Sequence, residues 1–407
     1  MTSEYKPLII AGKNSGIPVE LNPVQAEFYR NVETQARQGS YWATILIKDL
    51  QSLSSGHVKR NVFVADGPAD ASFKNLEMIL PGCRAKVMKC SSGKYLVYDL
   101  ELDVEYPELD TTYPDLQAVG KKPGLHQVRK LNSQWKPLFK NDGKLSKSPV
   151  PVVAVSDGYN AVTQAANSCA GHLADTKMVG SYMLDHQGFD MHYTPSAKIG
   201  GLTQINQALN AATDISLYES AALLAHTIEL SKDIKNVLWI TQGGGSGVFT
   251  HALSLLKGKG IDLKDSKHSI YFSHPTTSFI KAQALAMELG IKFDRDNLSV
   301  QPFNFNETVG GLNFGGGFIA GYQRMRQDPE YTALNYGVDS LKGIQRNWQP
   351  ISITAGCAAA VSAALGSGGT AAAIPAVITA ATAMAGLGHT LFQSWLPDKY
   401  RRLKQKL

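Results

Sequence analysis

The chain has 407 residues, of which 43% are hydrophobic and 18% charged, a composition that excludes an intrinsically disordered protein. Its formal net charge of +6 is small for this length and forms no dense basic tract before the C-terminus, so we expect no binding of nucleic acid. Four scattered cysteines do not make a disulfide framework, and the N-terminus lacks the apolar run of a signal peptide. These features predict a folded protein made in the cytoplasm.

Residues 1–150 are expected to form an N-terminal α+β region of irregular structure. Short runs with high β-propensity, at residues 41–47, 62–64, 86–88 and 95–98, are separated by turn residues. Asn22 and Pro23 are typical of a helix N-cap and first helical position, which predicts a helix that ends near Arg37. Residues 121–148 are basic, polar and without apolar periodicity, which favours a surface-exposed connection.

Strand-like and helix-like segments alternate in a second predicted domain, residues 151–345. We expect strands at residues 152–155, 189–193, 237–241, 269–272 and 298–303, and helices at 161–174, 202–212, 216–230, 248–256 and 278–289. This alternation predicts βαβ units and an α/β fold with a mostly parallel sheet and flanking helices. Because ligands bind at the carboxyl ends of the strands in such sheets, polar residues there are candidates for a site.

The last predicted domain, residues 346–407, has a long stretch without charge. No Lys, Arg, Asp or Glu occurs between Arg346 and Asp398, and basic residues lie on both sides of the stretch. This pattern predicts an apolar helical hairpin at residues 351–396 with a basic tail, both flanks lying on one side of a membrane. Because its first arm is shorter than the roughly 20 residues that span a bilayer, a membrane hairpin and a buried soluble hairpin both stay open.

A glycine-rich turn, GGGSG at residues 243–247, joins the predicted strand 237–241 to the helix that follows. A serine in a strand–turn–helix elbow is how α/β-hydrolases expose a nucleophile, but the G-x-S-x-G pattern around Ser246 is incomplete because Val248 is its last residue. Alignment on residues 242–244 instead gives Thr241 as the nucleophile.

Two other interpretations of this turn stay open. In the first, the glycines only make a tight turn, and the hydroxyls of Thr241 and Ser246 bond to the backbone. In the second, the small residues at the start of a helix hold an anion. Neither the P-loop nor the dinucleotide-binding glycine pattern is complete, and no histidine or cysteine cluster has metal-ligand spacing. We therefore expect no cofactor and no metal ion.

Four motifs, in their order and spacing over residues 152–325, resemble the α/β-hydrolase-like domains of bacterial secreted effectors and polymorphic toxins. They are VSDGYN, FDMHYTPSAKIGGL, VLWITQGG and IYFSHP, and the chain departs from those domains at the elbow, where ITQG stands in place of His-Ser-Gln-Gly. The resemblance implies an α/β-hydrolase-like fold and an antibacterial toxin that acts at a target membrane. It also implies membrane lipid, an immunity protein and a secretion-machine component as partners, and delivery by a dedicated secretion system.

Two functional hypotheses follow. The first is an ester or lipid hydrolase, with His274 at a strand end as its histidine, although the acids Asp294 and Asp296 follow that histidine and the usual triad order is not met. The second is a non-enzymatic membrane-active protein, pore-forming or membrane-anchored, that uses residues 351–396 with the sheet as a scaffold. The candidate catalytic residues are Thr241, Ser246, His274 and Asp157, and the candidates for substrate or oxyanion binding are Gln242, Gly243, Gly244 and Asn160.

Overall fold

The chain divides into two compact units, residues 1–312 and 313–407. The computed structural model describes residues 7–56, 61–64, 74–109, 120–176, 179–200 and 204–299. The predicted hairpin at residues 351–396 lies outside these ranges, as do residues 300–303 of the last predicted strand. Within them, no helix has both the length and the apolar character that crossing a membrane requires.

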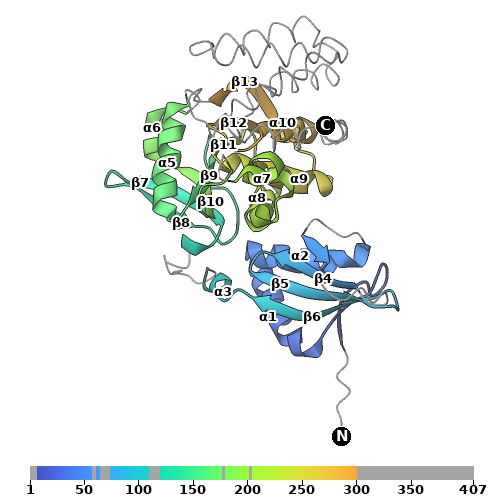
Figure 1. The fold of residues 1–407 in the computed structure, drawn as a ribbon. Helices are drawn as coiled ribbons and strands as arrows, with labels where there is room; N and C mark the ends of the chain where they lie inside the picture. The colour runs from blue at the N-terminus through green and yellow to red at the C-terminus, as the bar shows by residue number, and fades with distance from the viewer. Residues whose placement is uncertain are drawn as a thin grey trace, which may run out of the picture. The chain divides into compact units, whose positions relative to one another are not determined.

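The first of two sheets has six strands in the order β1-β2-β6-β5-β4-β3 (Figure 1). The strands are β1 (Leu8–Ala11), β2 (Val19–Leu21), β3 (Val62–Val64), β4 (Lys74–Leu80), β5 (Cys83–Lys89) and β6 (Tyr95–Leu102). All neighbours pair antiparallel except β2 and β6. Alternate residues of β5, such as Ala85 and Val87, are buried in one core with residues of α1 (Ala26–Arg37) and α2 (Tyr41–Ser52). A short helix, α3 (Glu105–Leu109), follows β6.

One prediction for this region is confirmed and one is wrong. Asn22 caps a 3₁₀ helix, Pro23–Gln25, by accepting a hydrogen bond from Val24 N, and α1 continues from it to Arg37 as expected. The strand predicted at residues 41–47 is instead the first half of α2. Eight of the residues of α2 are buried, among them Tyr41 and Trp42, so tertiary packing overrides the β-propensity of its Ile and Thr residues.

The second sheet has seven strands in the order β13-β12-β11-β9-β10-β7-β8. Its strands are β7 (Gly124–Leu131), β8 (Gln134–Phe139), β9 (Val152–Tyr159), β10 (Phe189–Pro195), β11 (Leu238–Gln242), β12 (Ser269–Ser273) and β13 (Lys292–Ser299). The five strands from β9 to β13 pair in parallel, whereas the β7–β8 hairpin is antiparallel. The fold is therefore α/β with mixed sheets and flanking helices.

The surface connection predicted at residues 121–148 is wrong, because residues 124–139 form the β7–β8 hairpin. β7 pairs with β10, so the second sheet begins at Gly124 and not after residue 150. The hairpin has the polar sequence expected of a connection because β8 is the edge strand, in which exposed and half-buried residues alternate. Within the hairpin, the fully buried core residues, Leu125 and Val128, belong to β7.

Helices cover both faces of the second sheet (Figure 1). The helices that follow β9 are α5 (Val162–Asp175), α6 (Ser181–Gln187), α7 (Ile205–Asn210), α8 (Tyr218–Leu230), α9 (Gly245–Gly258) and α10 (Phe279–Leu289). Val152 and Ala154 of β9 share a core with residues of α5 and α6, whereas Val153 and Val155 share one with residues of α8, α9 and α10. Alternate residues of a strand point to opposite faces, which is why this continuous apolar run indicates a sheet covered on both sides.

The α8 helix, YESAALLAHTIEL, is buried on nearly every side. Tyr218, Ala222 and Leu223 belong to the core of the first sheet. Ala221 and Leu224 belong to the core of the second. A helix that is apolar all round is expected to lie between packed layers. Residues 7–299 therefore use α8 as a shared core element.

The parallel strands place the candidate site. If the five parallel strands are numbered along the chain, with β9 as the first and β11 as the third, they lie side by side in the order 2-1-3-4-5. The chain leaves β9 toward one side of the sheet and returns to reach β11 on the other. In open sheets of this order ligands bind at that switch point, beyond the carboxyl ends of the two strands. These ends are Tyr159 and Gln242.

Candidate functional site

The elbow after β11 has its strained position at Gly243. This residue has φ of +51°, in the left-handed region, and α9 begins two residues later at Gly245. In an α/β-hydrolase elbow the nucleophile occupies the sharp strained turn. Here the residue at that place has no side chain, and Thr241 lies two residues earlier, within β11.

Asp157 fills the space next to this elbow. Its carboxylate accepts backbone hydrogen bonds from Gly158 N at 2.8 Å, from Ile199 N at 3.1 Å and from Gly244. The side chain is only 7% exposed, and burial raises the pKa of its carboxyl group, an effect that the three amides oppose. Asp157 thus acts as a built-in anion at the start of α9, which leaves the Gly244 amide committed to the protein itself.

The two predicted nucleophiles are buried in different surroundings. Thr241 is fully buried, and its hydroxyl has no hydrogen-bond partner among the described residues. Ser246 is also fully buried, and its Oγ donates to Gly243 O at 2.7 Å and lies 2.6 Å from Thr277 Oγ1. The bond from Ser246 to Gly243 O agrees with the interpretation in which the hydroxyls of the turn bond to the backbone, whereas the Thr241 hydroxyl, without a partner among the described residues, does not.

A polar cluster occupies the carboxyl edge beside the elbow. Gln242 Nε2 donates to Tyr159 Oη at 2.7 Å and to Ser168 Oγ at 2.6 Å, and Tyr159 Oη also donates to Ser168 Oγ at 2.7 Å. On its other side, Gln242 Oε1 accepts from Cys169 Sγ at 3.3 Å. Gln242 therefore connects the ends of β9 and β11 to α5.

The neighbouring strand end adds a serine and two histidines. Ser273 is the last residue of β12, and its Oγ lies 2.7 Å from Nδ1 of His172, a residue of α5. The ring of His172 packs edge to face against that of His274, with 5.3 Å between the ring centroids. Both histidines are half-buried, and His274 has φ of +50°, an uncommon conformation for a residue other than glycine. We call Tyr159, Ser168, His172, Gln242, Ser273 and His274 the edge cluster.

The remaining predicted catalytic and binding residues lie in three places: the edge cluster, the elbow and the exposed surface. Gln242 and His274 belong to the edge cluster. Gly243 N donates to Ser273 O at 3.0 Å and Gly244 bonds to Asp157, so both predicted oxyanion amides take part in the fold. Asn160, which follows β9, is exposed. Asn304 and Asn306, polar residues just after the predicted strand 298–303, lie outside the described residues.

Sequence reasoning did not find His172, Ser168 or Ser273 as site residues. A signal was present, because Ser168 and His172 stand four residues apart in a predicted helix and so share one face. Ser273 directly precedes the predicted site residue His274 at the end of a predicted strand. Only the packing of α5 over the carboxyl end of β12 brings the two groups together.

Two further side chains, Cys169 beside the edge cluster and Tyr159 within it, are poor nucleophiles. Burial raises the pKa of the Cys169 thiol, and the thiolate is the form that reacts. Burial also raises the pKa of the Tyr159 hydroxyl. Among the residues that the structure describes, no three His, Cys, Asp or Glu side chains come together as a possible metal site.

Comparison with known proteins does not assign this arrangement to a family. No family model matches the chain, and no curated protein and no solved structure matches it at a significant level. The contacts at the carboxyl edge of the second sheet are therefore the basis for a functional assignment.

Proposed function

We propose that this protein is a serine ester hydrolase in which Ser273 is the nucleophile and His172 is the general base. The observation that carries this proposal is the 2.7 Å contact between Ser273 Oγ and His172 Nδ1. A serine hydroxyl is a weak nucleophile until a positioned base takes its proton, and the contact lies within the range of about 2.6–3.2 Å that such a transfer needs.

The reaction follows from this pair. Ser273 Oγ attacks the carbonyl carbon of the ester while its proton passes to His172 Nδ1. The imidazolium then gives that proton to the leaving alkoxide, so that an alcohol departs and an acyl group stays on Ser273. Water, deprotonated by His172, attacks the acyl group and releases the acid, and the proton returns to Ser273.

The position of His172 favours the protonated, positively charged form of its ring. His172 lies in the last turn of α5, which ends at Asp175. The negative end of a helix dipole stabilises a positive charge there, which helps the ring to hold the proton during attack. The edge-to-face contact with His274 limits the movement of the base.

The setting that we propose for this activity is a bacterial secreted effector acting on lipid esters at a target membrane. Its support is the resemblance of four sequence motifs to effector and toxin domains with an α/β-hydrolase-like fold. The five parallel strands lie in the order β10-β9-β11-β12-β13, so that the first strand, β9, lies between the second and the third. This order is compatible with such a fold. An immunity protein and a secretion-machine component belong to the same proposal.

A second candidate function is favoured by a different observation. Asp157 occupies the space next to Gly243 and accepts a hydrogen bond from the Gly244 amide, so the elbow carries no nucleophile of its own and the Gly244 amide is used by the fold. A sheet with such an elbow would serve as a scaffold, and the protein would be a non-enzymatic membrane-active protein that uses residues 351–396.

Labelling with a fluorophosphonate probe separates the two candidates without knowledge of the substrate. The hydrolase is expected to take the probe on Ser273, located by peptide mass spectrometry on the full chain, and to lose labelling as Ser273→Ala. His172→Gln should slow labelling and short-chain ester turnover by about 10²- to 10⁴-fold. Thr241→Val is the matched control and should keep both. If folded wild-type protein shows neither labelling nor turnover, the hydrolase proposal is rejected and the non-enzymatic membrane-active protein is the candidate that stays.

A further inference from the structure

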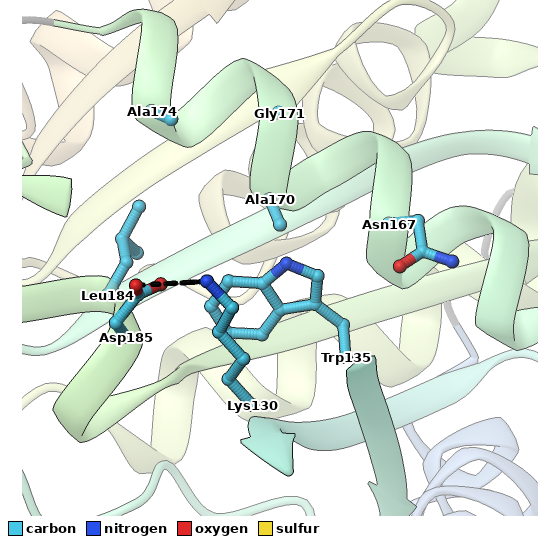
Figure 2. Close-up of a pocket in the computed structure, with 8 residues that line it drawn as sticks. All are labelled: Lys130, Trp135, Asn167, Ala170, Gly171, Ala174, Leu184 and Asp185. Carbon is cyan, nitrogen blue, oxygen red and sulfur yellow. Dashed lines mark hydrogen bonds and ion pairs between the residues drawn. The ribbon is translucent and has the colours of Figure 1, made fainter. Parts of the chain in front are cut away.

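A pocket with a cavity volume of about 450 Å³ lies between α5, α6 and the β7–β8 hairpin (Figure 2). Its lining residues are Lys130, Trp135, Asn167, Ala170, Gly171, Ala174, Leu184 and Asp185. The volume is within the range of small-molecule sites, about 300–1,000 Å³. The pocket shares no residue with the edge cluster.

The indole ring of Trp135 forms one wall of the pocket and is held in place from two sides. It packs edge to face against Phe189, with 5.6 Å between the ring centroids, and Lys130 Nζ lies 5.6 Å from the indole centroid. Trp135 is half-buried although it lies on the edge strand β8. A fixed, partly exposed indole offers a flat apolar surface together with an N–H donor.

The opposite wall is made of α5 residues with little or no side chain. Ala170, Gly171 and Ala174 line the pocket along α5, and Figure 2 shows Ala170 next to the indole of Trp135. A Cβ atom at Gly171 would meet no atom within 4 Å, and its φ is not in the left-handed region. The fold therefore does not require glycine here, although glycine inside a helix is less favourable than alanine. The small side chains leave the space in front of Trp135 open.

An ammonium group, a carboxylate and an amide lie around this space. Lys130 Nζ bonds to Asp185 Oδ1 at 2.8 Å and to Oδ2 at 2.9 Å, and the amide of Asn167 lies at the other end of the pocket (Figure 2). Because the ammonium and carboxylate charges compensate each other, the pocket does not select a charged ligand. It offers donors and acceptors at its rim and an apolar face at its wall.

We propose that this pocket binds the pyranose ring of a neutral saccharide. A pyranose has C–H groups on its faces and hydroxyl groups around its rim, which matches an indole wall with an amide, a carboxylate and an ammonium at the edges. The C–H face stacks on Trp135, and the ring hydroxyls bond to Asn167 and to the Lys130–Asp185 pair. This site is independent of the proposed hydrolase, because it uses none of its residues.

Calorimetric titration of the full chain with chitobiose, cellobiose and maltose tests the site. At least one disaccharide is expected to bind with a Kd of about 10 mM or tighter. Gly171→Leu places a larger side chain at a position where a Cβ atom meets no neighbour within 4 Å, and it should weaken that binding at least tenfold. Trp135→Leu should do the same. Gly258→Leu is the matched control, since Gly258 is also in a helix with no atom within 4 Å of its Cβ, and it should bind as wild type does.

Three results would overturn the proposal. One is the absence of binding by all three disaccharides to folded wild-type protein. Another is equal affinity in wild type and Gly171→Leu. The third comes from a parallel titration with adenosine, a ligand with a flat aromatic base. If adenosine binds and no saccharide does, the indole wall belongs to a nucleobase site. Since ester turnover is a separate measurement, failure here leaves the hydrolase proposal to its own test.

Discussion

The carboxylate of Asp157 occupies the space into which a side chain at Gly243 would project. A Cβ atom on Gly243 would lie 2.6 Å from Asp157 Oδ2, closer than real Cβ contacts come. Because Gly243 is also the strained residue of the elbow, this pair of residues decides that the turn carries no nucleophile of its own.

Gly243→Ala should therefore destabilise the protein strongly. Its left-handed backbone conformation alone costs a residue with a side chain about 1–3 kcal/mol, and the contact with Asp157 adds to this cost. Urea unfolding measures the difference. Gly258→Ala, in a helix and without steric conflict, should instead be neutral or stabilising by up to about 1 kcal/mol. If both variants unfold alike, the elbow is not strained as described.

Thr241→Val should be neutral or stabilising by up to roughly 1 kcal/mol, because it replaces a fully buried hydroxyl that has no partner among the described residues. Ser246→Ala should be destabilising by about 1 kcal/mol or more, because that hydroxyl bonds to Gly243 O and Thr277 Oγ1. Thermal unfolding distinguishes the pair. A loss of ester turnover in Thr241→Val with unchanged stability would restore Thr241 as a catalytic candidate.

Two buried histidines should make stability depend on pH in the acid range. Burial lowers the pKa of His126 to about 4 and, together with the nearby His126, that of His192 to about 3. Below the unfolded value of 6.5 the unfolded chain binds protons that the folded one does not, so stability is full above this pH and falls as the pH drops toward the folded values.

His126→Phe tests this dependence, because phenylalanine retains the ring that packs against Phe139 and Tyr193. The slope of the unfolding free energy between pH 6.5 and about 4 should decrease by up to about 1.4 kcal/mol per pH unit. His186→Gln is the control for loss of a surface histidine. An unchanged slope in His126→Phe would mean that His126 titrates alike in both states.

Tyr218 of α8 makes a buried hydrogen bond to Asp49 of α2, a helix that packs on the first sheet. Its hydroxyl donates to Asp49 Oδ2 at 3.0 Å, and both side chains are buried. Tyr218→Phe should cost about 1–3 kcal/mol, because the buried carboxylate loses a donor. Tyr182→Phe, at an exposed tyrosine, should change little. A double-mutant cycle with Asp49→Asn isolates the pair, and a coupling near zero would contradict the assigned contact.

Local patterns predicted the second sheet better than the first. The helix at 161–174 and the strands at 189–193 and 269–272 match α5, β10 and β12 within a few residues, because long apolar runs and turn residues mark their ends. The 41–47 run failed because helix and strand are both compatible with Tyr, Ile and Thr until packing decides. The β7–β8 hairpin was missed because an edge strand needs few apolar residues.

The sequence by itself determined the α/β class, the strand–turn–helix at residues 236–256 and the placement of Gln242 and His274 at strand ends. Those features depend on local periodicity and turn chemistry, which neighbouring residues control. Only the tertiary structure decided that Asp157 fills the elbow and that His172 meets Ser273, 101 residues along the chain. Such contacts arise where separate elements pack, and the spacing of residues along a sequence does not encode which side chains then meet.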